Sequence, residues 1–414
     1  MASLPSETIK NKVRLAYLVS HPIQYQAPLL RRIAQEPDID LTVFFGSDFS
    51  VRSYQDEGFG VEVKWDVPLL DGYRYEFLPV LRDNGTQTVT TPLNHGIMSR
   101  LRGRDGSPPF DVLWVHGYAM VNALHGLIAA KSLGIPVLLR GDMWLRDRPR
   151  SNFKLLLKKL FLESLKKMVD GVLPVGMLNT EYWRHYFGDD VPLFLMPYAV
   201  DNDSIQRRSA EARAGRDELM RELDLVEGRP VILFASKLQR RKQCNDLLEA
   251  YQTLVREWKE GPLPYLLIVG DGEERASLEE MASSSGLDGI RFCGFRNQSE
   301  LPRFFDISTV FVLPARHEPW GLIVNEVMNA GRAVIVSDDV GCQPDLITDG
   351  VEGCVYPVGD VNALMEALRR TLNSPETAAE MGRRALERIS TWSFEEDVHA
   401  LRCAIAQVTR KITA

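Results

Sequence analysis

The chain has 414 residues, of which 45% are hydrophobic and 25% charged, and this ordinary globular composition excludes global disorder. At about 150 residues per domain, the length predicts two or three domains. The net charge of −7 argues against a protein whose main role is to coat nucleic acid, so no nucleic-acid partner is expected.

Targeting and redox features predict a cytoplasmic protein. No apolar run approaches the roughly 18 residues that a membrane span needs. Residues 1–12 lack the apolar core of a signal peptide, so export is not expected. The five cysteines are an odd number with no Cys-x-x-Cys pair, which is typical of reduced thiols and does not favour a zinc site.

The first half of the chain alternates apolar strands with helical patterns. Strands are expected at 13–20, 41–45, 110–116, 136–140 and 171–175. Helices are expected at 25–35, 120–133, 153–168 and 178–186. This alternation predicts a parallel α/β sheet, with ligands bound outside the carboxyl ends of its strands.

The same rhythm restarts after residue 200. The polar segment 201–228 suits a linker followed by the opening helix of a second unit, and a helix is expected at 243–258. Further strands are expected at 229–235, 265–269, 290–293, 309–313 and 333–336. The chain therefore divides into an N-terminal domain, 1–200, and a C-terminal domain, 201–393, with a cleft between them.

The last segment, 394–414, is expected to form a helix over 394–412 that begins after Ser393. Glu396 lies three residues beyond that serine, as in a capping box. An apolar stripe recurs at spacings of three or four residues and needs a partner surface. Its members are Phe394, Val398, Leu401, Ile405 and Val408.

The segment 313–331 carries the strongest chemical pattern. It follows an apolar strand, Pro319 suits a first helical position, and Gly321 leaves room above the backbone. Free amides at such a helix start, here those of Gly321, Leu322 and Ile323, favour a bound phosphate.

Two acidic residues flank this helix start. Glu318 lies just before it and Glu326 about two turns inside it. An offset of eight residues places them about 80° apart around a helix axis, so both can face one cleft at different depths.

Several motifs in one order resemble the retaining glycosyltransferases of family 4, the glycosyl transferases group 1. The two glutamates and the residues around them are similar to the family's signature, and the resemblance is strong over 196–395. The other matching pieces are Met196-Pro-Tyr-Ala-Val-Asp201, Val231-Ile-Leu-Phe-Ala-Ser-Lys237 continuing to Lys242, Ile268-Val-Gly-Asp-Gly272, and Phe292-Cys-Gly-Phe-Arg296.

The resemblance implies a GT-B fold, in which two Rossmann-like domains face a cleft and the C-terminal helix crosses back to the N-terminal domain. It implies a hexosyltransferase-type enzyme that moves a sugar from a nucleoside-diphosphate sugar, UDP in preference to GDP, to an acceptor hydroxyl with retention. Polysaccharide, glycolipid or other glycoconjugate assembly is the expected setting, with no cofactor and no metal required.

Two alternatives stay open. One is a family 4 enzyme that glycosylates a small molecule. The other is a non-catalytic nucleotide-sugar-binding or epimerase-like protein on the same scaffold, against which the intact glutamate pair and both lysines argue. No Gly-x-Gly-x-x-Gly follows the first strand, which disfavours a dehydrogenase, and no phosphate loop supports an NTPase.

The resemblance also implies roles for individual residues. Those expected to be catalytic are His116, Glu318 and Lys242. Those expected to bind the donor diphosphate are Lys237, Lys242, Gly321, Leu322 and Ile323. Those expected to bind the nucleoside are Glu326, Phe295 and Arg296. Those expected on the acceptor side are His21, Gln24, Tyr25, Arg140 and Asp142.

The sequence departs from the family pattern at four places. Lys237 replaces an arginine and Gln243 a glycine, and a point charge at 237 still suits a phosphate. The segment 341–345 replaces a Gly-Gly-x-x-Glu motif, and 20–25 replaces a glycine-rich loop.

The segment 153–168 is both basic and apolar. Its apolar residues cover well over half of a helical wheel, which favours a packed core helix over an interfacial one. A weak contact with the inner membrane surface through 153–168 stays open.

Overall fold

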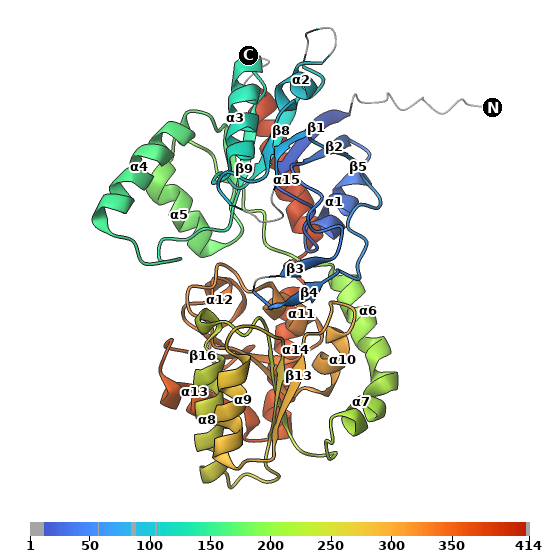
Figure 1. The fold of residues 1–414 in the computed structure, drawn as a ribbon, viewed down its shortest axis with the longest axis vertical. Helices are drawn as coiled ribbons and strands as arrows, with labels where there is room; N and C mark the ends of the chain where they lie inside the picture. The colour runs from blue at the N-terminus through green and yellow to red at the C-terminus, as the bar shows by residue number, and fades with distance from the viewer. Residues whose placement is uncertain (1–11, 57, 84–87, 104–105, 107, 411–414) are drawn as a thin grey trace, which may run out of the picture.

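The computed structural model describes residues 12–410, apart from 57, 84–87, 104, 105 and 107. Each half of the chain forms its own six-stranded parallel sheet with helices on both faces, and the two halves lie one above the other in Figure 1. The predicted fold class, two Rossmann-like α/β units, is confirmed.

The N-terminal sheet has the strand order β10-β9-β8-β1-β2-β5. Its central strands are almost entirely buried, because a parallel sheet covered on both faces requires apolar runs in place of alternation. The strands are β1 (Val13–Val19), β2 (Ile39–Phe45), β5 (Arg74–Phe77), β8 (Val112–His116), β9 (Val137–Arg140) and β10 (Gly171–Leu173). The helices are α1 (Ala27–Ala34), α2 (Ile97–Arg102), α3 (Val121–Leu133), α4 (Asn152–Lys166) and α5 (Met177–Phe187).

Between β2 and β8 the chain makes two small antiparallel pairs that the sequence did not predict. The first is the hairpin of β3 (Tyr54–Asp56) and β4 (Val61–Val63), and the second joins β6 (Val80–Arg82) to β7 (Leu93–Asn94). In Figure 1 the hairpin lies at the level where the two halves meet.

The C-terminal sheet has the order β13-β12-β11-β14-β15-β16. Its strands are β11 (Val231–Ala235), β12 (Tyr265–Val269), β13 (Ile290–Gly294), β14 (Val310–Leu313), β15 (Ala333–Ser337) and β16 (Gly353–Tyr356). Its helices are α8 (Cys244–Glu257), α9 (Arg275–Ser285), α10 (Leu301–Ile307), α11 (Leu322–Asn329), α12 (Gln343–Leu346), α13 (Val361–Leu372) and α14 (Pro375–Ile389).

The expected linker in 201–228 is largely helical. α6 (Asn202–Ala212) starts directly after Asp201, whose side chain accepts a hydrogen bond from the amide of Ser204 at 2.9 Å, and α7 (Arg216–Glu222) follows it. A carboxylate at this cap position satisfies one free amide of the first turn. The passage between the halves is therefore short.

The last helix, α15 (Phe394–Arg410), returns to the N-terminal half, as predicted. Val398, Leu401 and Ile405 of its apolar stripe are buried in the same core cluster as Leu15 of β1 and Leu173 of β10. The stripe thus finds its partner surface on the sheet of the first half.

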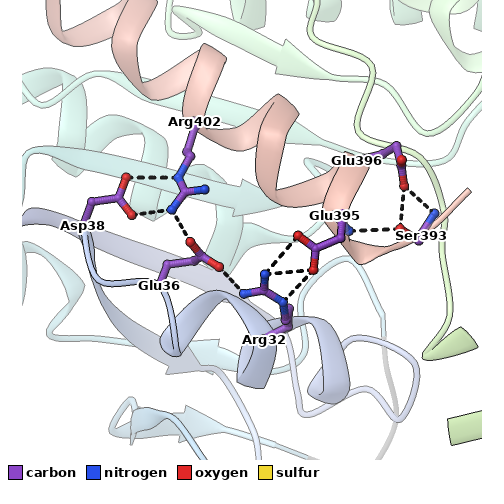
Figure 2. Close-up of polar contacts among 7 residues, drawn as sticks. All are labelled: Arg32, Glu36, Asp38, Ser393, Glu395, Glu396 and Arg402. Atoms are coloured by element: carbon purple, nitrogen blue, oxygen red, sulfur yellow. Dashed lines mark hydrogen bonds and ion pairs between the residues drawn. The ribbon is translucent and has the colours of Figure 1, made fainter. Parts of the chain in front are cut away.

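Ion pairs fix the exposed side of α15 against α1 and the turn that follows it (Figure 2). Arg32 binds Glu395 at 2.8 Å, and Arg402 binds Asp38 at 2.6 Å. Glu36 contacts both of these arginines.

The start of α15 is capped as predicted. Glu396 accepts hydrogen bonds from the amide of Ser393 at 2.9 Å and from its hydroxyl at 2.5 Å, and that hydroxyl accepts one from the amide of Glu395 at 3.1 Å.

Candidate active site

A cavity of about 500 Å³ lies between the two halves, a size typical of small-ligand sites. Both halves contribute to its wall. Among the predicted site residues, those that line it are His21, Gln24, Tyr25, Lys237, Lys242, Phe295, Arg296, Leu322, Ile323 and Glu326.

Lys242 is brought to this cavity by the loop after β11, where residues Arg240–Lys242 form a short 3-10 turn. Its side chain is only 7% exposed, and its Nζ lies 2.5 Å from Oε2 of Glu318. The guanidinium of Arg241 reaches the same oxygen at 2.8 Å. Two cations therefore share one buried carboxylate at the edge of the cavity.

This cluster shifts the pKa of both partners. Burial lowers the pKa of Lys242, and the neighbouring carboxylate only partly offsets that effect. Burial alone would raise the pKa of Glu318, but the charges and hydrogen bonds of Lys242 and Arg241 outweigh it and lower the pKa. Glu318 is thus held as a carboxylate.

The loop after β14 positions Glu318 through its backbone. The amide of Glu318 donates to the carbonyl of Asp339 at 3.1 Å, and the preceding residue, His317, has a left-handed φ of 53°. Such backbone strain is concentrated at functional sites. The Glu318 carboxylate itself is turned toward Lys242 and is not part of the cavity wall.

The helix start differs slightly from the expectation. Gly321 adopts a left-handed φ of 90°, and α11 begins at Leu322, so Pro319 is not its first residue. Leu322 and Ile323 line the cavity at the start of the helix, whereas Gly321, the residue before them, is not part of the wall.

Glu326 faces the cavity from the second turn of α11. Burial raises the pKa of its carboxyl group to about 7, although Arg208 and a hydrogen bond from Gln298 act in the opposite direction. The Gln298 side-chain amide lies 3.4 Å from Oε1 of Glu326. The carboxyl group therefore titrates near neutral pH.

The loop after β13 places Phe295 and Arg296 in the wall. The Arg296 guanidinium is bound at 3.0 Å to the carbonyl of Cys293 and at 3.2 Å to Glu300. Its side chain is therefore engaged within the loop, which leaves Phe295 and the backbone to face a ligand.

On the N-terminal side, His21, Gln24 and Tyr25 all reach the cavity from the turn after β1. The Tyr25 hydroxyl lies 3.4 Å from that of Tyr198, and burial raises the pKa of Tyr25 to about 12.

Asp142 follows β9 and lies outside the cavity wall. Burial raises the pKa of its carboxyl group, and the charge of Glu318 across the interface raises it further. The two carboxyl groups therefore influence each other from opposite halves of the molecule.

Two predicted residues occupy positions that differ from the expectation. Arg140 is 2% exposed, and its guanidinium binds the carbonyls of Met196 and Pro197 at 3.1 and 2.8 Å, as well as Asp397 of α15 at 3.4 Å. Its placement on the acceptor side is therefore corrected: it ties the passage between the halves to the last helix.

His116 ends β8, as predicted, but it is not part of the cavity wall, and the Gln26 side chain, just before α1, lies at hydrogen-bond distance, 3.0 Å, from its ring nitrogens. Burial, together with the charges of Arg140 and His21, lowers the pKa of His116 to about 3. The imidazole is therefore neutral and cannot act as a charged acid at neutral pH.

The altered segment 341–345 is not part of the cavity wall, although the amide of Gly341 donates to the carbonyl of Glu318 at 2.9 Å. The carboxylate of Asp345 accepts a hydrogen bond from the amide of Met177, at 2.9 Å, at the start of α5. This hydrogen bond joins the two halves.

Four of the other wall residues come from a segment that was not predicted to contribute to the site. They belong to the hairpin β3–β4 and the residues beside it, and are Tyr54, Asp56, Phe59 and Trp65. Short strands without apolar periodicity carry little signal, although the density of aromatic residues between 49 and 65 could have marked the segment.

Helix α4 contradicts the expectation of a packed core helix. Only Leu162 and Leu165 of α4 are buried. The large apolar side chains that it exposes are Phe153, Leu155, Leu156, Leu157, Leu160 and Phe161. Figure 1 shows α4 at the outer edge of the N-terminal half. Of the helices in the described part of the chain, none is both long and apolar enough to cross a membrane.

Comparison with known proteins gives a family match within the C-terminal half. Residues 215–388 match the family Glycosyl transferases group 1, which confirms the resemblance based on the motifs. This stretch contains both lysines, both glutamates and the whole of the C-terminal sheet.

Sequence relatives match over less than half of the chain. Alpha-D-kanosaminyltransferase of Streptomyces kanamyceticus is 31% identical over 183 residues, 44% of this chain and 46% of the relative. The lipopolysaccharide core biosynthesis glycosyltransferase LpsE of Rhizobium meliloti is 32% identical over 168 residues, 40% of this chain and 46% of the relative. The chain spans about half the length of these relatives.

The fold is similar over nearly the full chain. Anabaena HepE in complex with UDP has a TM-score of 0.70 at 15% identity, covering 95% of this chain and 99% of that one. At this identity the likeness shows the fold alone, and the fold is GT-B.

Proposed function

We propose that the protein is a retaining glycosyltransferase that moves a sugar from a nucleoside-diphosphate sugar to an acceptor hydroxyl. The observation that supports this most directly is the cavity itself. It joins two lysines and Glu326, from the half that matches the glycosyltransferase family, to His21, Gln24 and Tyr25 of the other half.

Departure of a nucleoside diphosphate requires that its developing negative charge be neutralised. Lys237 and Lys242 lie in the loop after β11, and the start of α11 faces the same space with its backbone amides. Fixed charges and dipoles of this kind stabilise a leaving group without reorganisation during the reaction. In this proposal no metal is needed, and the lysines and amides together hold the diphosphate.

The two glutamates would take different parts of the donor. Glu326 in the wall would accept hydrogen bonds from the ribose, with Phe295 and the adjoining backbone against the base. Glu318 would hold Lys242 in place and bind sugar hydroxyls once the donor brings them to its edge of the cavity. A carboxylate already hydrogen-bonded by two cations is a fixed acceptor for such hydroxyls.

Retention follows if the acceptor attacks the face of the sugar from which the diphosphate departs. The transition state then has oxocarbenium character, and the departing phosphate oxygen accepts the proton of the acceptor hydroxyl. The neutral imidazole of His116 would shape the sugar site through hydrogen bonds and not through proton transfer. The turn that carries His21, Gln24 and Tyr25 would contact the acceptor.

The donor is proposed to be a UDP-sugar in preference to a GDP-sugar, since a protein with the same fold has been seen with UDP. The acceptor is proposed to be a growing glycoconjugate such as a polysaccharide or glycolipid, as the name of LpsE suggests for that relative. Transfer to a small molecule is the second candidate, favoured by the likeness to a kanosaminyltransferase.

A glycolipid acceptor would also explain why α4 exposes a row of large apolar side chains. Residues 153, 156, 157, 160 and 161 recur at the spacing of one helix face, and on this face Phe153 is 68% exposed and Leu160 58%. The side chains of Lys154 and Lys159 are exposed on the same helix. A basic helix with an exposed apolar face binds an anionic membrane surface, so we propose that α4 docks the protein at the inner face of the cytoplasmic membrane.

The test of the activity is a direct one. The purified chain would be mixed with UDP-glucose, UDP-galactose, UDP-N-acetylglucosamine or GDP-mannose and an acceptor extract, and both the released diphosphate and the anomeric configuration of the product would be measured. A retained configuration is expected. Binding of a nucleoside diphosphate without any transfer would indicate the non-catalytic alternative, and an inverted product would contradict the mechanism.

A further inference from the structure

The hairpin β3–β4 belongs to the N-terminal half but contacts the C-terminal half at the positions assigned to the donor. Its Asp56 reaches the loop after β11, and its Phe59 reaches the loop after β13. Figure 1 shows the hairpin directly above the C-terminal sheet. The hairpin therefore contacts both of the loops that are expected to bind the donor.

Asp56 binds the lysine expected to receive the diphosphate. Its Oδ1 lies 2.7 Å from Nζ of Lys237, and its side chain is only 11% exposed. The same oxygen accepts hydrogen bonds from the backbone amides of Gly58 and Phe59 at 2.8 and 2.9 Å. The backbone of the hairpin thus holds the Asp56 carboxylate against the ammonium group of Lys237.

Asp56 carries its negative charge in this position. Burial alone would raise the pKa of its carboxyl group, but the hydrogen bond from Lys237 and those from the backbone outweigh burial and lower the pKa. The hairpin also approaches very closely: a Cβ added to Gly58 would lie 2.7 Å from Cδ of Lys237. Lys237 is thus covered by the hairpin as well as paired.

A second set of contacts covers the loop expected to hold the base. The rings of Phe59 and Phe295 lie 4.8 Å apart, edge to face. Just past the hairpin, the carbonyl of Lys64 accepts a hydrogen bond from the Asn297 side chain at 2.7 Å, and Asp66 binds the Ser299 hydroxyl. The hairpin therefore spans both ends of the space that a nucleoside diphosphate would need.

We propose that Asp56 is a built-in competitor of the donor: its carboxylate occupies Lys237 until a nucleoside diphosphate displaces it and lifts the hairpin. This step presupposes the proposed function, because it takes Lys237 as a diphosphate ligand. A carboxylate and a phosphate oxygen make the same charge-assisted hydrogen bond to an ammonium group, so one can replace the other. Asp56 then lowers the affinity for the donor and couples donor entry to movement of the N-terminal half.

The experiment compares the full chain with Asp56→Asn, which keeps an oxygen for the amides of Gly58 and Phe59 but removes the charge. Binding of UDP, GDP, ADP and dTDP would be measured by calorimetry. We expect Asp56→Asn to bind the preferred diphosphate about tenfold more tightly, a change of about 1.4 kcal/mol. The matched control is Asp48→Asn, which removes a charge from the same segment but pairs with Arg52; its affinity should be unchanged.

Hydrogen exchange separates displacement from simple charge repulsion. In the unsubstituted chain, amides of residues 58–66 should exchange faster when the diphosphate is bound, since the hairpin has been lifted. Protection of these amides, or equal or weaker binding by Asp56→Asn, would overturn the inference while leaving the proposed function intact. Failure of the unsubstituted chain and of Asp56→Asn to bind any of the four diphosphates would overturn both.

Discussion

Lys242 and Glu318 form a buried ion pair at 2.5 Å that links the loop after β11 to the loop after β14. Removal of one partner of a buried pair can cost about 3 kcal/mol, and here the cost should be smaller, about 1–3 kcal/mol, because Arg241 still reaches Glu318. We therefore expect Lys242→Met to lower the free energy of unfolding by this amount in urea titrations, and to reduce transfer by about a hundredfold or more.

The double variant Lys242→Met/Glu318→Gln gives the control for this prediction. It removes both charges, so much of the lost stability should return while transfer stays low. Strictly additive losses of stability would show that the two side chains do not depend on each other.

The raised pKa of Glu326 predicts that donor binding depends on pH. Its pKa is raised to about 7, so its carboxyl group is protonated below that value and charged above it. If the charged form accepts the ribose hydroxyls, affinity for the nucleoside diphosphate should rise as the pH increases from 6 to 8. Because a terminal phosphate also titrates near about pH 6, the measurement is the difference between the unsubstituted chain and Glu326→Gln. Parallel pH profiles for the two proteins would contradict the assignment.

Transfer should persist in excess chelator. The lysines and the helix start are expected to neutralise the diphosphate, so addition of EDTA should change the initial rate by less than about twofold. The measurement is diphosphate release with and without EDTA. Complete loss of activity that magnesium restores would rule out the metal-independent mechanism.

Helix α4 predicts membrane binding that depends on its apolar face. Leu156→Glu/Leu160→Glu should abolish cosedimentation with vesicles that contain phosphatidylglycerol, and raised salt should weaken binding by the unsubstituted chain. Ile128→Glu is the matched control, since Ile128 is 53% exposed on α3 of the same half. Equal binding by the double variant and the control would show that α4 is not the docking face.

Substitutions in the buried apolar stripe of α15 should lower the free energy of unfolding strongly, whereas substitutions on its exposed surface should lower it only slightly. Leu401→Ala should cost about 2–4 kcal/mol, because it opens a cavity in the core shared with β1. Arg402→Ala should cost about 1 kcal/mol or less, since its ion pairs with Glu36 and Asp38 are partly exposed (Figure 2). Cys403→Ala, at an exposed position, is the control and should change stability by under about 0.5 kcal/mol.

Much of this architecture could be predicted from the sequence because parallel strands buried on both faces leave continuous apolar runs. The stretch that contains Val231–Ala235 is one example, and it was correctly assigned. The stripe of α15 was equally informative, since a regular apolar face on a terminal segment must find a partner. The motif around Glu318 and Glu326 also indicated which loops would meet.

The remaining features depend on tertiary contacts that a local pattern does not encode. The periodicity of 153–168 shows an apolar face but not whether another element covers it, and among the described residues none covers Leu160, which is 58% exposed. Arg140 ends a strand as a site residue would, yet its guanidinium turns toward Asp397, some 250 residues away in the chain. The hairpin at Asp56 consists of strands too short to produce a recognisable period.

The position of α15 has a consequence for how the protein is made. The core of the N-terminal half includes Leu15, near the start of the chain, and Leu401, near its end. The strands of the first sheet are synthesised early, but one face of that sheet stays without its covering helix until α15 has left the ribosome. The core of the C-terminal half includes Ile389 and Trp392, with Phe394 packed against it, so it needs less of the final helix and can complete its packing slightly earlier. The half that is translated first is therefore the one that finishes folding last.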